Sequence, residues 1–529
     1  MRAIAVFLTI WTPFFVFAAH RGYPIPATSL VYSAAACVLP AIILSVICGR
    51  EGGKRQAIVF TVLVLLALDI QFDWVKGAAA YATILALLAS FWILLRHIAT
   101  ILAVTFGVLL VSTAALGTLE PYQEVRVAES AGAADGSARQ KATGLLIHLL
   151  LDEHTGVMGI PTEFSGGAEL RRDLRDFFTA NGFRLFGNAV SEYEASRNSI
   201  SGILNFTAGP TPYDLYDGRE PYILKRSRYF EALAEAGYDI RVYQATYMDY
   251  CREFPALVSG CYTYLHDGTD WMATSVLGDL DKLYAVFGLY LQLSGTVVEK
   301  VLKTYVRLDQ RLQAYGLHLP RLPKWDDGPG PMNAMATFDR VIEDATSGPD
   351  GTAYFAHLLI PHGPYAYDRE CRLRPHVNSW LSNRPPFRRE NSESERRLSY
   401  AAYFEQLRCM QAKLQQLFDG LRASGRFDGA TIIVHGDHGS RIHRVAARAE
   451  NLDRLEPRDY RDGFATLFAA KAPAMAAGYD EESAPVSRLL ARAIGRSDLV
   501  REPDAAIQVY LEGKDDYDPW TAVPWQFSE

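Results

Sequence analysis

The chain has 529 residues, of which 49% are hydrophobic and 21% are charged, and its formal net charge is −7. This length allows more than one domain. The mild acidity and the lack of a basic tract in the sequence argue against a nucleic-acid-binding surface, so we expect no nucleic acid among its partners.

The first part of the chain is strongly apolar and predicts five membrane-spanning helices. The apolar segments cover residues 3–19, 27–47, 57–74, 78–95 and 98–116. Each is close to the ~20 residues that a helix needs to cross a bilayer. Charges are confined to the segment ends, which disfavours the alternative of buried core helices. Four further spans follow the first segment, so an uncleaved helix is preferred to a signal peptide. We therefore predict a multi-pass membrane domain over residues 1–119.

The charges in the short loops predict the orientation of this domain. Arg50, Lys54 and Arg55 lie between the second and third segments, and Arg96 lies between the fourth and fifth. The positive-inside rule places both loops in the cytoplasm. The N-terminus would then be cytoplasmic, and everything after the fifth segment would be periplasmic, outside the inner membrane.

The rest of the chain predicts a linker followed by one large domain. Residues 120–143 are polar and rich in Ala, Gly and Ser, which is typical of a linker. Residues 144–529 alternate apolar runs with amphipathic stretches, the pattern of an α/β domain with a mostly parallel central sheet. Candidate strands are residues 144–151, 183–186, 239–243, 353–359, 430–435 and 464–470. Candidate helices include residues 167–181, 226–237, 393–424 and 485–494.

One further apolar stretch, residues 283–302, is interrupted and carries Glu299 and Lys300 near its end. It predicts an amphipathic helix rather than a sixth span. A core helix is the plainer interpretation, and a helix on the membrane surface is the alternative.

Four of the six cysteines fall in the domain predicted to lie outside, where disulfides persist. Their short separation favours a Cys251–Cys261 bond, which leaves Cys371 and Cys409 as the second pair. Four cysteines allow three connectivities, so this pairing is a hypothesis. The other two cysteines belong to the second apolar segment.

The turn after the predicted strand at residues 430–435 carries Asp437 and His438 between two glycines. Open α/β sheets bind ligands at the carboxyl ends of their strands. An Asp-His pair there predicts half of a metal site, whereas a water-facing turn is the plainer alternative. We expect Gly436 and Gly439 to let backbone and metal approach closely. For His435, facing the site and packing beneath it both stay open.

Three other stretches offer polar residues in comparable positions. Asp152 and Glu153 follow the first predicted strand, Ser196 precedes a short apolar run, and His357 and His362 belong to a strand and its proline-bounded loop. Each has a plainer explanation, such as a helix cap or a solvated loop. Together they suit one divalent metal ion, Zn²⁺ or Mn²⁺, with Ca²⁺ for an all-oxygen variant. A metal-bound serine hydroxyl ionises more readily and can attack phosphorus or sulfur.

The order of these motifs resembles the alkaline phosphatase/sulfatase superfamily. Five spans before an exported catalytic domain are more narrowly similar to lipid A phosphoethanolamine transferases and lipoteichoic acid (phosphoglycerol) synthases, and the resemblance covers essentially the whole chain. It implies a sulfatase-like α/β fold. The residues that it assigns are Ser196 as nucleophile, Asp152, Glu153, Ser196, Asp437 and His438 as metal ligands, and His357 and His362 as substrate contacts.

The chain departs from the family patterns around the nucleophile. In the transferase motif T-x-x-S-[IV]-P, Ser196 stands for Thr and Ser201 stands for Pro, and Ser191 and Ser199 are alternative nucleophiles. The formylglycine sulfatase motif C/S-x-P-x-R lacks its Pro and Arg here. This difference favours phospho-transfer over sulfate ester hydrolysis.

The resemblance implies a metal-dependent enzyme of the inner membrane. It would transfer a phospholipid-derived group, of the phosphoethanolamine or phosphoglycerol type, to a glycan or glycolipid through a phosphoseryl intermediate. Its partners would be a phospholipid donor, that acceptor and the surrounding membrane lipids. One alternative is a membrane-anchored sulfatase or phosphodiesterase with the same site. The other is a catalytically inactive structural or regulatory relative.

Overall fold

The computed structural model describes the chain except for residues 50–52, 73–76, 95, 120–141, 208–220, 382–390, 501–505, 514–519 and 527–529 and most of residues 293–327. The predicted linker, residues 120–143, therefore lies almost entirely outside the described residues. The chain forms two compact units, and each is described by itself.

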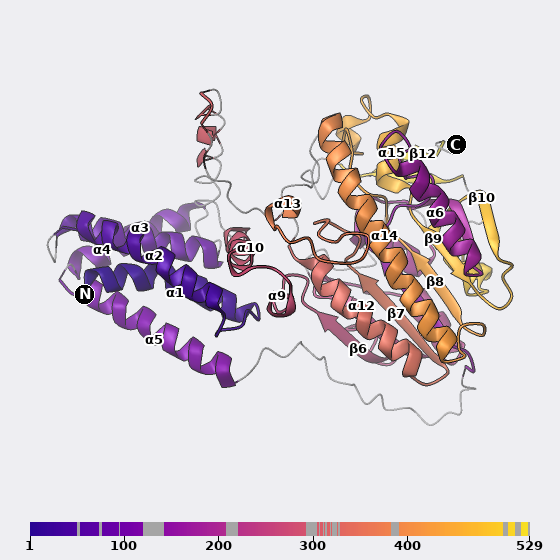
Figure 1. Ribbon diagram of the computed structural model, residues 1–529, viewed down its shortest axis with the longest axis horizontal. Coiled ribbons are helices and arrows are strands. Elements are labelled where there is room, and N and C mark those ends of the chain that lie inside the picture. Colours follow the sequence, from indigo (N-terminus) through magenta and orange to yellow (C-terminus); the bar gives the residue numbers. More distant parts are fainter. Residues whose placement is uncertain are drawn as a thin grey trace. The chain divides into compact units, whose positions relative to one another are not determined.

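The first unit contains a helix at each of the five predicted apolar segments (Figure 1). These helices are α1 (Arg2–His20), α2 (Thr28–Ile47), α3 (Lys54–Phe72), α4 (Gly77–Ile93) and α5 (Ile98–Leu119). Three of them, α1, α2 and α5, are long and apolar enough to cross a membrane. Membrane crossing by α3 and α4, and the orientation of the N-terminus, stay predictions.

The first unit also includes two segments from much later in the chain, Gly268–Trp325 and Pro375–Leu381. Their helices are α9 (Trp271–Thr274), α10 (Asp279–Gln292) and α13 (Asn378–Leu381). The predicted division into a membrane domain, residues 1–119, and one later domain, residues 144–529, is therefore incomplete. The physical reason is that α10 packs an apolar face against α1 and α2.

The second unit is built on an eight-stranded sheet with the order β10-β2-β9-β8-β1-β7-β4-β6. Neighbouring strands are parallel except where β9 pairs antiparallel with β2 and β8. This confirms the predicted α/β fold with a mostly parallel sheet. The strands are β1 (Leu146–Leu151), β2 (Arg184–Val190), β4 (Asp239–Ala245), β6 (Val258–Tyr264), β7 (Thr352–Leu358), β8 (Thr431–His435), β9 (Phe468–Lys471) and β10 (Gly478–Pro485).

Helices cover both faces of this sheet, as its apolar central strands require. On one face α6 (Gly167–Ala180), α12 (Gly330–Ser347) and α14 (Glu393–Ala423) pack together, and Figure 1 shows them in front of the strands. On the other face lie α7 (Ser196–Asn205), α8 (Arg228–Glu235) and α16 (Val486–Ala493). The remaining elements are α15 (Pro457–Phe464), the 3-10 turns Ala449–Asn451 and Ser497–Leu499, and the short strands β3 (Tyr222–Ile223), β5 (Met248–Asp249), β11 (Gln508–Leu511) and β12 (Thr521–Pro524).

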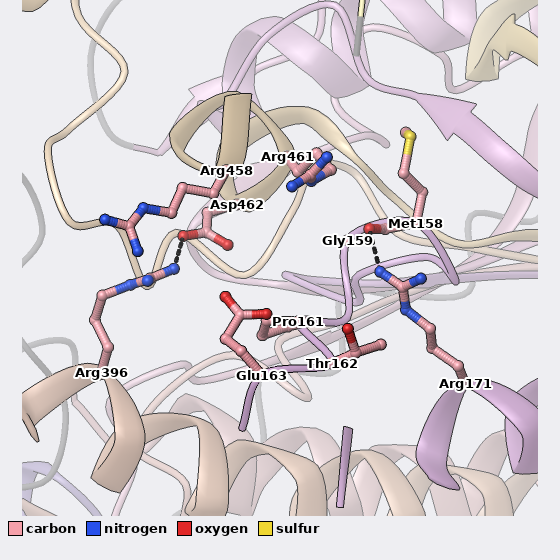
Figure 2. Close-up of a pocket in the computed structure, with 10 residues that line it drawn as sticks. All are labelled: Met158, Gly159, Pro161, Thr162, Glu163, Arg171, Arg396, Arg458, Arg461 and Asp462. Carbon is pink, nitrogen blue, oxygen red and sulfur yellow. Dashed lines mark hydrogen bonds and ion pairs between the residues drawn. The ribbon is translucent and has the colours of Figure 1, made fainter. Parts of the chain in front are cut away.

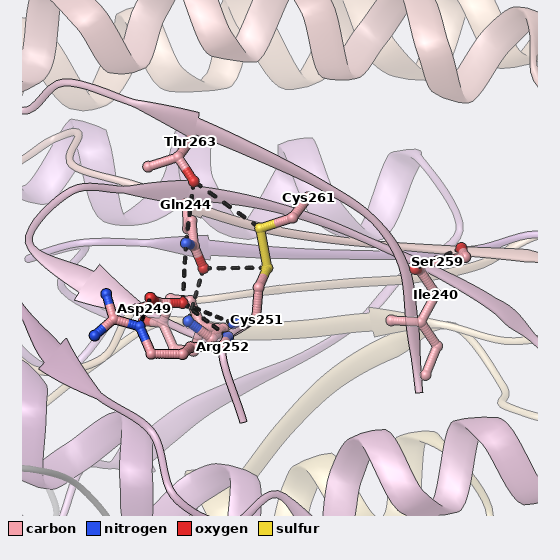
Figure 3. The surroundings of a disulfide bond; sticks show 9 residues. Ile240, Gln244, Asp249, Cys251, Arg252, Ser259, Cys261 and Thr263 are labelled. Atoms are coloured by element: carbon pink, nitrogen blue, oxygen red, sulfur yellow. Dashed lines mark hydrogen bonds and ion pairs between the residues drawn. A yellow bond between two sulfur atoms is a disulfide. The ribbon is translucent and has the colours of Figure 1, made fainter. Parts of the chain in front are cut away.

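Both hypothesised disulfides are confirmed, Cys251–Cys261 and Cys371–Cys409. Figure 3 shows the first of them beside Gln244, which links the strands around it. The Gln244 side chain accepts from the backbone N–H of Tyr250 at 2.7 Å and donates to the Thr263 hydroxyl at 3.1 Å. The bond thus ties the chain after β5 to the edge strand β6.

Candidate active site and metal centre

Three adjacent parallel strands bring the predicted site residues to one edge of the sheet. In the pairing of β1 with its two neighbours, Leu150 lies level with both His357 of β7 and His435 of β8. The residues that follow β1 and β8 therefore emerge side by side. Asp152 and Asp437 are both buried there.

The hydrogen bonds of His438 leave one ring nitrogen for a ligand. Its Nδ1 lies 3.0 Å from the carbonyl of Gly439, which can only accept, so Nδ1 carries the proton. Nε2 then has a lone pair, and it lies 3.1 Å from Asp437 Oδ2, 3.2 Å from Ser196 Oγ and 3.9 Å from Asp152 Oδ1. An imidazole lone pair and a carboxylate oxygen at this distance need a positive charge between them.

Without a metal, that charge is a proton. Burial alone would lower the pKa of His438, but the charges of Asp437 and Asp152 and the hydrogen bond to Asp437 together raise it. Burial alone would raise the pKa of Asp437, but the charge of His438 and the hydrogen bonds from His438 and Ser196 are among the causes that together lower it. Metal ligands must be deprotonated, so a metal would compete with this proton.

Two further observations fit a divalent cation. Asp152 Oδ1 is buried and accepts no hydrogen bond from the residues that the structure describes, and the buried Asp437 Oδ2 faces His438 Nε2. Asp152, Glu153 and Asp437 place three buried carboxylates together, and Glu153 is the one that pairs with the guanidinium of Arg441. Buried charge of one sign is costly unless it is compensated. Asp152, Asp437 and His438 offer ligand atoms within 4.8 Å of one another, as do Asp152, Glu153 and His362.

Ser196 is the serine that faces this cluster. It is the first residue of α7 and nearly buried, and the positive end of the helix dipole favours an ionised hydroxyl there. The alternative Ser199 donates to the carbonyl of Asp437 at 2.5 Å and lies 2.9 Å from the hydroxyl of Ser191. Ser191 and Ser199 thus hold the turn by hydrogen bonds, whereas the Ser196 hydroxyl points to His438 and the other predicted metal ligands.

Asp152 and Glu153 have different surroundings. Asp152 belongs to both candidate metal clusters, whereas Glu153 accepts a bond from Arg441 Nε at 2.8 Å. Arg441 Nη2 also lies 3.3 Å from His362 Nε2, so one guanidinium links Glu153 to the predicted substrate contact. Glu153 and Arg441 have φ of 62° and 53°, which residues other than glycine rarely adopt unless their surroundings fix them. Sequence reasoning missed Arg441, although a cation three positions after His438 was a signal.

His357 is buried and is oriented by a residue that sequence reasoning also missed. Its Nε2 lies 3.5 Å from Asp152 Oδ2, and its Nδ1 lies 2.9 Å from the hydroxyl of Tyr250. Because a carboxylate faces Nε2, the proton belongs on that nitrogen and Nδ1 accepts from Tyr250. No local pattern could have shown this contact, since the two residues are 107 positions apart.

The glycines of the turn have a different role from the one predicted. A Cβ on Gly436 would come within 2.4 Å of the carbonyl oxygen of His154, and one on Gly439 within 2.4 Å of that of Asp462. Protein backbone, not a metal, requires glycine at both positions. His435 packs beneath the site, stacked on Phe468, and burial lowers its pKa to about 4, so it stays neutral.

A polar cavity of about 160 Å³ lies beside Asp462, the residue whose carbonyl contacts this turn (Figure 2). Four arginines line it, Arg171, Arg396, Arg458 and Arg461. Arg396, from α14, pairs with Asp462 of α15 at 2.6 Å, and the Asp462 carbonyl accepts from the backbone N–H of Arg441 at 2.8 Å. The buried ion pair in the cavity wall therefore fixes the backbone of the site.

No protein-family model and no curated protein sequence matches the chain. Several solved structures are similar in fold. The crystal structure of the C-terminal periplasmic domain of EcEptC from Escherichia coli has a TM-score of 0.41 and 12% identity, covering 73% of this chain and 94% of that one. The same domain in complex with Zn gives the same values.

Two other structures are similar in fold. The phosphonate monoester hydrolase of Agrobacterium radiobacter has a TM-score of 0.42 and 11% identity, covering 71% of this chain and 82% of that one. The putative sulfatase yidJ from Bacteroides fragilis has a TM-score of 0.39 and 13% identity, covering 72% and 83%. At these TM-scores and identities, the likeness concerns the arrangement of the chain alone.

Proposed function

We propose that the chain is a metal-dependent enzyme of the inner membrane that transfers a phospholipid-derived phospho-substituent, of the phosphoethanolamine or phosphoglycerol type, to a glycan or glycolipid. The observation that carries the proposal is the Ser196 hydroxyl, held at a helix N-terminus 3.2 Å from His438 Nε2 and beside two orphaned carboxylate oxygens. The apolar helices α1, α2 and α5 support a membrane location, which suits a lipid donor.

The residues that would hold the metal are Asp152, Ser196, Asp437 and His438, with Glu153 beside them. Zn²⁺ or Mn²⁺ suits this mixture of oxygens and one imidazole. When bound, the metal would lower the pKa of the serine hydroxyl and offset negative charge at phosphorus.

The chain's own residues account for the rest of the chemistry. Ser196 Oγ loses its proton and bonds to phosphorus, the bond from phosphorus to the diacylglycerol oxygen breaks, and that oxygen takes up a proton. The acceptor oxygen then loses its proton and bonds to phosphorus, the bond from phosphorus to Ser196 Oγ breaks, and Oγ takes up a proton. His357 presents its Nε2–H at the edge of the carboxylate cluster, where it can donate to a phosphoryl oxygen.

One observation favours hydrolysis instead. Sulfatases are similar in having two adjacent acids after the first strand, and here both Asp152 and Glu153 reach the site. The second candidate is therefore a membrane-anchored sulfatase or phosphodiesterase, in which water replaces the acceptor hydroxyl in the second step.

The test uses the full chain in detergent with fluorescent phosphatidylethanolamine or phosphatidylglycerol. Transfer predicts that diacylglycerol release beyond about one equivalent per enzyme depends on an added glycolipid acceptor, and that Ser196 alone gains a phospho-adduct by mass spectrometry when acceptor is withheld. Ser196→Ala removes both signals, whereas Ser394→Ala, at an exposed position of α14, leaves both unchanged. Release that ignores the acceptor supports the hydrolase. An adduct on Ser199 or Ser191 refutes the assignment of Ser196.

A further inference from the structure

Exposed apolar side chains are distributed unevenly over the residues that the structure describes. Beyond the five N-terminal helices, eight large apolar side chains are exposed, and six of them belong to the segment Gly268–Trp325. Those six are Val276, Leu280, Phe287, Leu308, Tyr315 and Leu317. The other two, Leu398 and Leu452, stand singly in the second unit, which is ordinary for a soluble surface.

Helix α10 of this segment is apolar on two sides. One side is buried and includes Ala285, Val286 and Leu289. The other side carries Leu280 and Phe287, which are 69% and 37% exposed. The sequence holds no charged residue between Lys282 and Glu299. A helix that is apolar all round is buried in protein or in lipid, and protein covers only the first side of α10 among the described residues.

The buried side of α10 docks on the adjoining ends of α1 and α2. On this side the Tyr290 ring lies 5.4 Å from both Phe14 and Phe17 of α1. Phe287 stands at the boundary of the two sides: its ring lies 6.2 Å from that of Phe14, and 37% of the residue is exposed. At the start of α10, Asp279 accepts a hydrogen bond from Thr28, the first residue of α2. Upstream, Thr269 donates through its N–H and its hydroxyl to the carbonyl of Arg21. These contacts fix where α10 lies along the two membrane helices.

The contacts also give the depth of α10. Phe14 lies six residues before the end of α1 at His20, which corresponds to about 9 Å along the helix axis. The 14 described residues of α10 extend about 21 Å, less than the ~30 Å core of a bilayer. This part of the chain starts level with Thr28 and reaches Phe14, so it lies within one leaflet.

We propose that α10 is a half-inserted membrane helix whose outward side, with Leu280 and Phe287, contacts the acyl chains of the outer leaflet. The partner of this surface is the lipid bilayer, because α10 begins beside Thr28 of α2 and the next turn of α2 carries the exposed side chains of Val31 and Tyr32. The assignment of the outer leaflet rests on the proposed membrane topology, in which the catalytic unit lies outside.

The segment that carries α10 joins the catalytic unit close to a residue that contacts the proposed site. The segment leaves the catalytic unit four residues after Tyr264, at the end of β6. The Tyr264 hydroxyl donates to the carbonyl of His357 at 3.1 Å. A lipid-bound segment is thus joined by a short run of chain to a residue that supports the site.

The test places nitroxide labels on the full chain in phospholipid nanodiscs. In a background with Cys37 and Cys48 replaced by Ala and both disulfides intact, labels go on Leu280→Cys and Phe287→Cys. Val46→Cys, on a 73% exposed side chain of α2, is the lipid control, and Leu398→Cys, on a 64% exposed side chain of α14, is the aqueous control. We expect the α10 labels to match Val46→Cys, with oxygen accessibility at least threefold above that of a water-soluble nickel chelate.

Two results would overturn the inference. Labels on α10 that match Leu398→Cys would place its outward side in water. Labels shielded from both oxygen and the nickel chelate would place it against protein, either a partner or a second copy. A photoactivatable phospholipid with the unlabelled chain gives a second readout, in which α10 peptides must carry the lipid adduct. Both readouts use Ser196→Ala equally well, so they remain informative if the proposed reaction is wrong.

Discussion

Metal binding to the apo protein should release a proton, and Asp437→Asn should abolish that coupling. In the metal-free site the pKa of His438 is raised, because Asp437 Oδ2 lies 3.1 Å away and favours the charged ring. A bound Zn²⁺ would need the lone pair of Nε2. We therefore expect metal binding to release about one proton per ion at a pH below the pKa of His438, with fewer as the pH rises above it.

The stabilisation that accompanies binding can be estimated. A ligand that binds only the folded state at 100 times its Kd adds about 2.7 kcal/mol. For a domain of this size, that corresponds to a rise in Tm of roughly 5 °C. Asp437→Asn removes the charge that faces His438, so metal affinity should fall at least 100-fold and the rise in Tm should vanish at the same Zn²⁺ concentration.

The assay is isothermal titration calorimetry on chelator-treated protein in two buffers of different ionisation enthalpy, with Tm measured alongside. Asp419→Asn is the matched control, since Asp419 is 61% exposed on α14 and is not in either metal cluster. It should behave as the wild type does. Binding without proton release, or unchanged affinity in Asp437→Asn, would refute the assignment of this cluster as the metal centre.

Three further changes test the surroundings of the site. Tyr250→Phe leaves the buried Nδ1 of His357 without its hydrogen-bond donor, so the free energy of unfolding should fall by about 1–3 kcal/mol. The kcat on bis(p-nitrophenyl) phosphate should fall about tenfold, and the metal stoichiometry should not change. Burial raises the pKa of Glu192 from 4.5 to about 8. Between these two pH values only the folded state keeps the proton, so the free energy of unfolding falls as the pH rises. Glu192→Gln should therefore add at most about 5 kcal/mol to the free energy of unfolding at pH 8 and nothing at pH 4, as measured by chemical denaturation. Arg396→Met leaves the buried carboxylate of Asp462 without its ion-pair partner and should lower the free energy of unfolding by about 3–5 kcal/mol. Adding Asp462→Asn should restore part of this loss.

The sequence predicted the strands of the site well because buried parallel strands have a strong local signal. The apolar runs of β1, β7 and β8 are such strands, and the acids and histidines follow them directly. The predicted strand at residues 464–470 began too early, because Phe464 still belongs to α15 and β9 begins at Phe468, with isolated bridges at Ala465 and Thr466 between them. Strands β6 and β10 were not predicted, since their runs are too polar to stand out.

The parts of the site that escaped prediction depend on contacts between distant residues. The resemblance favoured Ser196 as nucleophile and left Ser191 and Ser199 as alternatives, and the bonds of Ser199 to Asp437 and Ser191 distinguish Ser196 from them. Tyr250 carries no local motif at all. The glycines of the turn were predicted for the wrong reason, because the backbone that crowds them comes from other parts of the chain.

The composition of the first unit from separate stretches of chain has a consequence for biosynthesis. When α5 leaves the ribosome, the surface of α1 that receives Tyr290 is already made, but roughly 170 residues must still be synthesised before Tyr290 itself exists. At about 5–20 residues per second this delay is on the order of 10–30 s. During that time Phe14 and Phe17 of the nascent helices are not yet covered by the Tyr290 ring. A fragment that stops at Gln123 would leave this surface of α1 uncovered, so the first unit is complete only after the chain through α10 has been made.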